Sequence, residues 1–319
     1  MTTVAPKMKI LLLGSTDLTL AVAEALLAMG LPPVGVVSVG RSFQISYQAD
    51  AVRNVRFADM ATWCAARGIA HFGYDGPDSL AVGATATGAE CSIAAGWYHM
   101  LPARVRTLFP MGCFGLHPSL LPAYRGGAPL NWAMLNAEAE TGVSLYGLGD
   151  GVDDGPLYGQ RRFPLHDDDY IADVLGRAQA AAVDLLRECL PRIVAGDIVP
   201  VPQVGSPSYG LQRHPDDGRI DWSRPAASIL RLIRAVSRPY PGAFGVVEGA
   251  VVRIWRARLA GEAASVWGAC GQIARVPGFD APLVVTGDGL LAIQEAEDQA
   301  GDCAMERLRQ WSQRRFSSG

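Results

Sequence analysis

The residues best suited to chemistry in this chain are one histidine and a cluster of carboxylates that follows it. His117 ends an apolar run, and three aspartates, Asp153 among them, lie in the glycine-rich segment Gly149 to Pro156. A histidine beside a carboxylate forms a general base that tolerates becoming charged. The alternatives are a core histidine bonded to a backbone carbonyl, and a solvated acidic turn or calcium site. Residue spacing alone leaves these alternatives open.

The elements that must position these residues follow the rhythm of an α/β fold. Apolar runs typical of buried parallel strands lie at residues 9–13, 34–39, 69–72 and 91–95, and helical periodicity fills 18–29, 58–67 and 79–87. This alternation predicts an open, Rossmann-like doubly wound α/β sheet. The strand that ends at His117 would deliver the imidazole to the carboxyl edge of the sheet, where such folds bind ligands.

After residue 142 the pattern changes. We expect strands at 143–148 and 157–165, a long amphipathic helix at 171–194, and a linker in the Pro-, Gly- and Ser-rich stretch 199–210. A helix at 225–236 and short strands at 245–247, 251–257, 272–275, 283–286 and 290–294 then indicate a small barrel. Residues 305–319 are expected to form a helix that frays. The predicted domains are 1–204 and 205–319.

Composition narrows the function classes. The 319 residues are 49% hydrophobic and 18% charged with a net charge of −3, so the chain folds around a large core and has no basic footprint for nucleic acid. None of the six cysteines forms a CxxC pair or a Cys/His cluster, so we expect no metal site. The N-terminus lacks a signal-peptide pattern and no stretch is long enough to span a membrane, which predicts a cytoplasmic protein without a membrane partner.

The sequence lacks the glycine motif of a dinucleotide-binding site. The turn after the first strand, Gly14-Ser15-Thr16, holds one glycine, whereas the fingerprint needs three in the order G-x-G-x-x-G. No acidic residue ends the second strand, where Gly40 and Arg41 follow Val39. A nicotinamide-dependent dehydrogenase is therefore excluded.

An ordered set of motifs closely resembles the folate-dependent formyltransferase family, which includes methionyl-tRNA, glycinamide ribonucleotide and sugar N-formyltransferases. The motifs are HPSLLP at 117–122, YRGGAP at 124–129, TGVS at 141–144 and VDDGP at 152–156. The resemblance continues into PDDGRIDW at 215–222, IRAV at 233–236 and PYPGAF at 239–244. It implies the formyltransferase fold with a small C-terminal OB-like, barrel-like domain.

The resemblance also implies roles for individual residues. The co-substrate would be 10-formyltetrahydrofolate, whose formyl carbon an amine attacks; His117 would take the proton of the amine and Asp153 would hold the imidazole. Two segments would line the pterin ring on opposite sides. These segments are Gly149, Asp150, Gly151 and Val152, and Trp97, Tyr98, His99, Met100 and Leu101.

One position departs from the family pattern. The family places an Asn two residues before the His to donate to the developing oxyanion, and this chain has Gly115 there. Loss of one such donor costs a factor on the order of 10²–10³ in rate. Asn131, Tyr98, His99 or a water would have to substitute. Otherwise the chemistry has changed within the scaffold, or the protein binds folate and substrate without turning them over.

The acceptor is inferred from charge and from one motif. The stretch 41–56, where a tRNA-modifying member carries a basic loop, holds three Arg and no Lys. RGGAPLNW at 125–132 is more similar to sugar N-formyltransferases than to the tRNA enzymes. We therefore expect a small amine, an amino sugar carried on a nucleotide, with Arg125, Asn131 and Tyr240 binding it. The alternative is a methionyl-tRNA formyltransferase. The oligomeric state stays open, a homodimer included.

Overall fold

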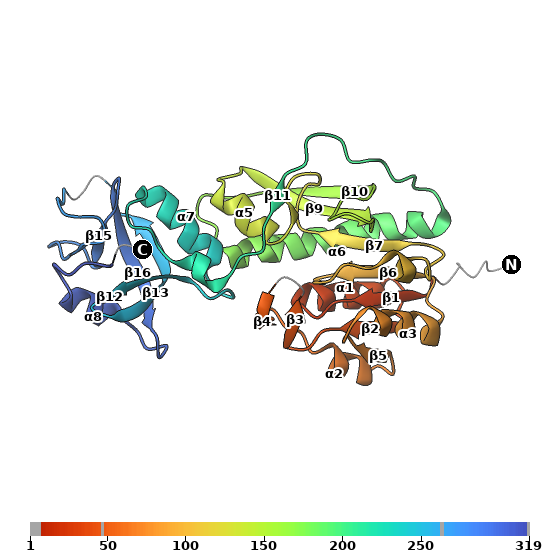
Figure 1. Ribbon diagram of the computed structural model, residues 1–319. Coiled ribbons are helices and arrows are strands. Elements are labelled where there is room, and N and C mark those ends of the chain that lie inside the picture. Colours follow the sequence, from red (N-terminus) through yellow and green to blue (C-terminus); the bar gives the residue numbers. More distant parts are fainter. Residues whose placement is uncertain (1–7, 46–47, 262–264, 318–319) are drawn as a thin grey trace. The chain divides into compact units, whose positions relative to one another are not determined.

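The computed structural model describes residues 8–45, 48–261 and 265–317 (Figure 1). The chain divides into two compact units. The first holds most of the chain up to Pro129 together with Glu140–Pro164 and Gly176–Gly210. The second holds Leu130–Ala139, Leu165–Leu175 and the chain from Leu211 onward. The boundary at 204/205 stays a prediction.

The first unit is built on a seven-stranded sheet in the order β10-β9-β7-β6-β1-β2-β5. Five of its strands run parallel, while β9 is antiparallel to β7 and β10 to β9. Their bounds are β1 Ile10–Leu13, β2 Gly35–Ser38, β5 Ala70–Gly73, β6 Cys91–Ala95, β7 Cys113–His117, β9 Glu140–Gly147 and β10 Leu157–Pro164. Every residue of β1, β2, β6 and β7 is buried, as continuous apolar runs in a parallel sheet require. The predicted α/β fold is confirmed.

Four helices come from segments expected to be helical: α1 Asp17–Ala28, α2 Met60–Ala65, α3 Pro77–Thr87 and α6 Ile171–Ala195. Two short helices, α4 Ala103–Arg106 and α5 Pro129–Leu135, were not predicted. Thr16 caps α1 through its side chain, and Leu80 and Ala84 of α3 pack into one core with Leu11 and Leu13 of β1. Helices α1, α2 and α3 pack against strands of the sheet, and loops follow the carboxyl ends of β6 and β7.

A short hairpin was missed by the sequence prediction. It consists of β3 (Ser42–Ile45) and β4 (Gln48–Arg53), which pair antiparallel. Asn54, directly after β4, is buried, and its side-chain amide donates to the carbonyl of Ser15 at 3.0 Å. The strands are short and largely polar, so the sequence shows no alternating hydrophobic pattern that would predict them.

The stretch 199–210, interpreted above as a linker, is hydrogen-bonded to the first unit instead. β11 (Tyr209–Gly210) pairs in parallel with β8 (Arg125–Gly126), and Val201 forms a bridge with Leu157. Proline, glycine and serine suppress a readable period, but their backbone groups still need partners and find them on neighbouring segments.

The second unit is an antiparallel sheet packed on one amphipathic helix. The sheet has the order β12-β13-β16-β15-β14, and α7 contributes Ile229, Leu230 and Ile233 to its core. The bounds are η1 Pro215–Gly218, α7 Ala226–Val236, β12 Ala243–Val247, β13 Ala250–Leu259, β14 Ile273–Ala274, β15 Leu283–Val285, β16 Leu290–Asp298 and α8 Met305–Gln310. The short antiparallel strands agree with the predicted barrel-like domain.

The end of this unit is ordered by strand pairing rather than by a fraying helix. Helix α8 ends at Gln310, after which Phe316 forms a bridge with Val247 of β12 and Arg315 forms one with Gln272. One segment thus joins residues at both ends of the sheet order and closes it in part. The predicted frayed end was wrong, because two consecutive residues bonded to different strands leave no helical pattern in the sequence.

Candidate active site

His117 is the last residue of β7 and is 7% exposed. Its Nε2 lies 2.8 Å from the carbonyl oxygen of Tyr124, and its Nδ1 lies 3.4 Å from Oδ2 of Asp153. A carbonyl oxygen only accepts, so Nε2 carries a hydrogen and Nδ1 is the nitrogen that faces the carboxylate. The backbone contact expected of a core histidine and the carboxylate contact expected of a general base are therefore both present.

The Asp153 carboxylate is held by two further donors. Its Oδ2 accepts from the backbone N–H of Gly126 at 2.8 Å, and its Oδ1 accepts from the hydroxyl of Tyr146. Asp153 has a positive φ of 49°, which turns its side chain out of the loop toward β7 and β9. Burial, and then the nearby Asp153 charge, raise the pKa of Tyr146 well above its ordinary value, so the phenol stays a donor.

The loop that carries Asp153 is too tight for most side chains. A Cβ atom at Gly155 would lie 1.8 Å from the carbonyl oxygen of Gly147, so only glycine fits where the loop returns to the sheet. The hydrogen bond from Gly147 N–H to the carbonyl of Pro156, at 2.8 Å, closes the same loop. The motif GDGVDDGP at 149–156 thus fixes the backbone that presents Asp153.

Gly115, where the family motif has Asn, is covered by a tyrosine ring. Gly115 stands opposite Tyr146 in the β7–β9 register. A Cβ atom at Gly115 would lie 2.6 Å from Cε1 of Tyr146 and 2.9 Å from Cδ2 of Leu148. The direction in which a side chain at this position would project is therefore already filled.

The segment expected to form one wall of a folate pocket follows β6 and is an aromatic cluster. Trp97 and His99 both pack on Tyr74, with ring centroids 4.8 and 4.4 Å apart, and Tyr98 packs on Phe43 at 4.8 Å. Tyr74 and Phe43 were missed by the sequence prediction because they lie in separate loops and strands with no motif of their own. Leu101 is buried, whereas Met100 is 51% exposed.

Two polar atoms of this wall are buried without a hydrogen-bond partner among the described residues. They are Nε1 of Trp97 and Nε2 of His99. Burial lowers the pKa of His99, so the imidazole is neutral near pH 7. Buried polar atoms of this kind are stabilised when a ligand or a water supplies the missing bond.

Arg106 joins this wall to the acidic loop. The guanidinium donates to the carbonyl oxygens of Leu101 and Gly149 at 2.7 and 2.8 Å and to the Asp150 carboxylate. Its side chain is 17% exposed, whereas the side chain of Asp150 is largely exposed. The two segments expected on opposite sides of a pterin, 97–101 and 149–152, are thus brought together. Gly149 contributes its backbone to this contact, and within the same loop Gly151 is half-buried and Val152 is exposed.

The sequence could not single out Arg106, because it lies in the four-residue helix α4 beside a second arginine, Arg104. The partners of Arg106 lie 5, 43 and 44 positions away along the chain. Hydrogen bonds to residues so distant in the chain depend on the tertiary structure, and no local sequence pattern predicts them.

The residues expected to bind the acceptor divide between the two units. Arg125 belongs to the first unit and donates to Oε1 of Gln203 at 2.7 Å, while Nε2 of Gln203 donates to the carbonyls of Asp153 and Gly155, both at 2.8 Å. Asn131 and Tyr240 belong to the second unit. There Asn131 is buried and its amide donates to the carbonyl of Ala235 at 2.6 Å, and Tyr240 is half-buried.

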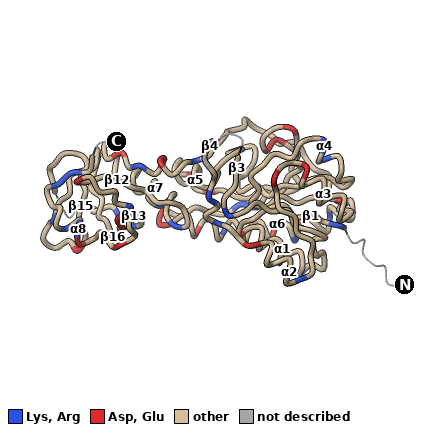
Figure 2. Tube along the Cα trace, turned by 60° about the horizontal axis from the view of Figure 1, so that its bottom comes forward, with Lys and Arg blue, Asp and Glu red and all other residues tan. Residues whose placement is uncertain are grey.

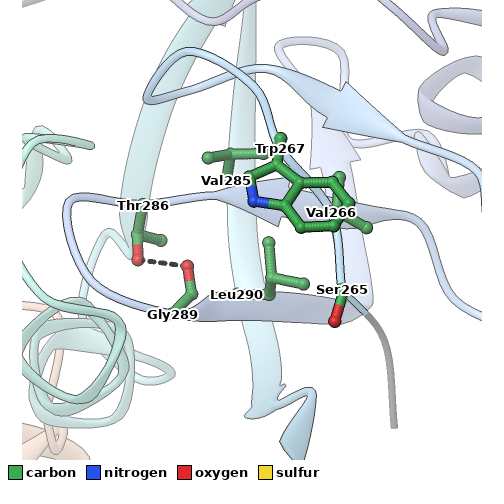
Figure 3. Close-up of a pocket in the computed structure, with 7 residues that line it drawn as sticks. All are labelled: Ser265, Val266, Trp267, Val285, Thr286, Gly289 and Leu290. Carbon is green, nitrogen blue, oxygen red and sulfur yellow. Dashed lines mark hydrogen bonds between the residues drawn. The ribbon is translucent and has the colours of Figure 1, made fainter. Parts of the chain in front are cut away.

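A hollow of about 290 Å³ lies in the second unit, and the described residues that line it include no titratable side chain. Trp267, 91% exposed, borders it, and the hydroxyl of Thr286 is bonded to the carbonyl of Gly289 at 2.7 Å (Figure 3). The rest of its lining is Ser265, Val266, Val285 and Leu290. The described lining of this hollow thus offers no acid–base pair comparable to His117 and Asp153.

The described residues offer neither a cluster of metal ligands nor a helix suited to a membrane. No group of three or more His, Cys, Asp or Glu side chains in the described part of the chain could hold a metal ion. Among the described helices, none combines the length and the apolar character needed to cross a membrane.

The fold of this chain is similar to that of several solved structures. HypX from Aquifex aeolicus in complex with tetrahydrofolic acid is 20% identical with a TM-score of 0.66, over 92% of this chain and 44% of that one. An N-formyltransferase from Helicobacter canadensis, in complex with folinic acid and dTDP-3-aminofucose, is 17% identical with a TM-score of 0.65, over 90% of this chain and 99% of that one. Methionyl-tRNA formyltransferase from Clostridium thermocellum is 17% identical with a TM-score of 0.56, over 80% and 95%.

At these identities the likeness shows the fold, and this chain spans less than half the length of HypX. The family model for formyl transferase matches residues 67–190, which include the His117 and Asp153 motifs. The model for the formyl transferase C-terminal domain matches residues 213–312. The chain therefore belongs to the formyl transferase family, as its motifs indicated.

Proposed function

We propose that this protein transfers a formyl group from 10-formyltetrahydrofolate to the amine of a small acceptor, an amino sugar carried on a nucleotide. The observation that carries the proposal is the His117–Asp153 pair, with 3.4 Å between Nδ1 and Oδ2, at the carboxyl end of a strand in a formyl transferase chain. The ligands named with the solved structures, tetrahydrofolic acid in one and folinic acid with dTDP-3-aminofucose in another, support the donor and the acceptor class.

The chemistry assigned to the pair is proton transfer. As the amine nitrogen bonds to the formyl carbon, His117 accepts at Nδ1 the proton that the amine loses, because Nε2 already carries the hydrogen that bonds the Tyr124 carbonyl. Asp153 stabilises the imidazolium that results, and the donors on its two oxygens keep the carboxylate aimed at Nδ1. When the intermediate collapses, the bond from the carbon to N10 of the folate breaks and the proton is passed to the departing nitrogen.

The residues beside the pair fit a folate ring. A pterin has polar edges and a flat face, and the wall after β6 offers aromatic rings together with the two unpartnered atoms, Nε1 of Trp97 and Nε2 of His99. Arg106 holds the facing loop against this wall. These residues would orient the donor and exclude water from the formyl carbon.

The acceptor is inferred from charge. The chain carries 28 Lys and Arg against 31 Asp and Glu, and blue and red segments are interspersed along the trace in Figure 2. A protein that grips a polynucleotide needs a dense basic surface. A single nucleotide-linked sugar needs only a few cations, and Arg125 lies one residue from Gly126, whose N–H bonds Asp153.

The test is a transfer assay with 10-formyltetrahydrofolate and a panel of nucleotide-linked amino sugars, followed by product mass. We expect a product heavier by one formyl group with at least one sugar. His117→Ala should lower kcat by a factor on the order of 10²–10⁴, the usual contribution of a positioned acid–base residue. The matched control is His166→Ala, which removes an exposed histidine and should leave kcat unchanged.

Charged initiator tRNA is the second acceptor in the same assay. If it is formylated while every sugar is refused, the proposed acceptor class is wrong and the formyl transfer stands. If His117→Ala transfers formyl as fast as the wild type, the assigned chemistry is wrong whatever the acceptor.

A further inference from the structure

A buried tyrosine stands where the family motif would place an amide. Tyr146 of β9 is directly opposite Gly115 in the antiparallel β7–β9 register and is 5% exposed. Its ring occupies the space above Gly115, since a Cβ atom there would lie 2.6 and 2.9 Å from two ring carbons. An Asn at 115 therefore requires the Tyr146 ring or the strand that carries it to shift.

The hydroxyl of the same tyrosine is directed at the catalytic carboxylate. It donates to Oδ1 of Asp153, while the N–H of Gly126 donates to Oδ2, the oxygen that faces His117. One oxygen of Asp153 is thus anchored to a buried phenol and the other is left for the imidazole. Without the phenol, the carboxylate could rotate and present either oxygen to His117.

The ring of Tyr146 also packs edge-on to the imidazole, with centroids 6.5 Å apart and planes at 85°. A single side chain therefore contacts the glycine that departs from the motif and the carboxylate that serves the histidine.

We propose that Tyr146 is a positioning residue of this formyl transferase, which holds the Asp153 carboxylate toward His117, and that position 115 is glycine because the Tyr146 ring fills its side-chain space. The inference rests on the proposed function, since it concerns the same pair. It explains why the amide is missing without supposing that the site is inactive: the family's donor has been exchanged for a phenol that acts on the carboxylate.

The first experiment removes only the hydroxyl. Tyr146→Phe keeps a ring over Gly115 and takes away a hydrogen bond to a charged group, which should lower kcat about 10- to 100-fold. The KM values for donor and acceptor should stay within about twofold, because the hydroxyl that is removed bonds the Asp153 carboxylate. Tyr158→Phe is the matched control: its ring packs on Phe114 of the same sheet at 5.1 Å, and it should keep the wild-type kcat.

The second experiment reads the position of the imidazole without turnover. Protein labelled with 15N-histidine gives ring-nitrogen resonances, and those of His117 are identified by their loss in His117→Ala. We expect Tyr146→Phe to shift the Nδ1 resonance of His117 and to leave the other four histidines in place. Tyr158→Phe should shift none of them.

The third experiment tests the exchange itself. In the wild-type background Gly115→Asn should lower kcat on the order of 10- to 100-fold, because the clash displaces the strand that ends at His117. In the Tyr146→Ala background the ring is gone, and of the three atoms nearest a Cβ at 115 only the end of the Leu148 side chain remains, so the same substitution should leave kcat unchanged or raise it. Gly115→Ala introduces the clash without an amide. In the wild-type background it should lower kcat as Gly115→Asn does, and in the Tyr146→Ala background it should not raise kcat.

Three results would overturn the inference. They are a higher kcat for Gly115→Asn in the wild-type background, a wild-type kcat for Tyr146→Phe, and a Tyr146→Phe spectrum with His117 unmoved. The proposed function fails differently: no acceptor is formylated, yet the Nδ1 resonance of His117 still shifts in Tyr146→Phe. Thermal melting of each variant separates loss of folding from loss of positioning.

Discussion

Asp153 receives a backbone N–H from Gly126 and a phenol from Tyr146, so its carboxylate is oriented before any substrate arrives. Such preorganisation matters because a carboxylate that must first reorient stabilises the developing imidazolium less. The motif alone predicted that His117 and Asp153 act together. It could not indicate Tyr146, because that residue lies within an ordinary strand pattern and its partner is known only once the register is.

We expect Asp153→Asn to keep the fold and to lower kcat by a factor on the order of 10²–10⁴, since the amide no longer stabilises a charged His117. The hydrogen bond from Gly126 can be retained by the amide oxygen, so KM should change little. Single-turnover formyl transfer measures the effect. Asp168→Asn, at an exposed carboxylate, is the control, and an equal loss there would assign the effect to net charge instead.

At the scale of elements, α4 does more than connect β6 to β7. Its two arginines differ in surroundings: Arg106 is largely covered and bonds both walls of the candidate folate site, whereas Arg104 forms an exposed ion pair with Asp78 at 2.7 Å. Exposed pairs of this kind contribute little. The covered one fixes the distance between two segments that are far apart in the sequence.

Arg106→Ala should therefore weaken binding of a folate analogue about 10- to 100-fold, because the carbonyls of Leu101 and Gly149 lose their donor and the walls separate. Isothermal titration calorimetry with folinic acid measures it directly. Arg104→Ala removes an arginine from the same helix and should bind as the wild type does. Equal weakening in both variants would show that helix stability, not the bridge, is responsible.

The sequence predicts an element well when the pattern that specifies it lies in consecutive residues, and poorly when its partners are distant in the chain. β1 and β6 were predictable because burial on both faces demands unbroken apolar runs, and His117 because its motif spans consecutive residues. The β3–β4 hairpin and the β8–β11 pairing were not, because their strands are short and their partners are distant. The same holds for Arg106, whose partners are backbone carbonyls that carry no residue identity.

The molecule as a whole consists of two units with separate cores, and its acid stability is set in part by two histidines of the first. Burial lowers the pKa of both His71 and His99 below the ordinary value of 6.5. The unfolded chain therefore binds more protons than the folded one as the pH falls through that value, and stability falls with it. Above pH 6.5 these histidines are neutral in both the folded and the unfolded chain, so they no longer affect the free energy of unfolding.

His99→Gln should accordingly flatten the fall in melting temperature between about pH 7 and about pH 5, because it removes one group that titrates only on unfolding. Differential scanning calorimetry across this range provides the measurement. His166→Gln, at an exposed histidine, should keep the wild-type slope. A slope unchanged by His99→Gln would mean that this ring is protonated equally in both states.

The pairing of residues 313–317 has a consequence for how copies of this protein meet. Ser317 N–H bonds the carbonyl of Val246 at 2.7 Å, and Phe316 N–H bonds that of Gly271 at 2.9 Å. Backbone groups that would otherwise invite a strand from a neighbouring molecule are thus occupied by the chain itself. Loss of this short segment would expose these backbone groups of the second unit and favour strand pairing between molecules, and so aggregation.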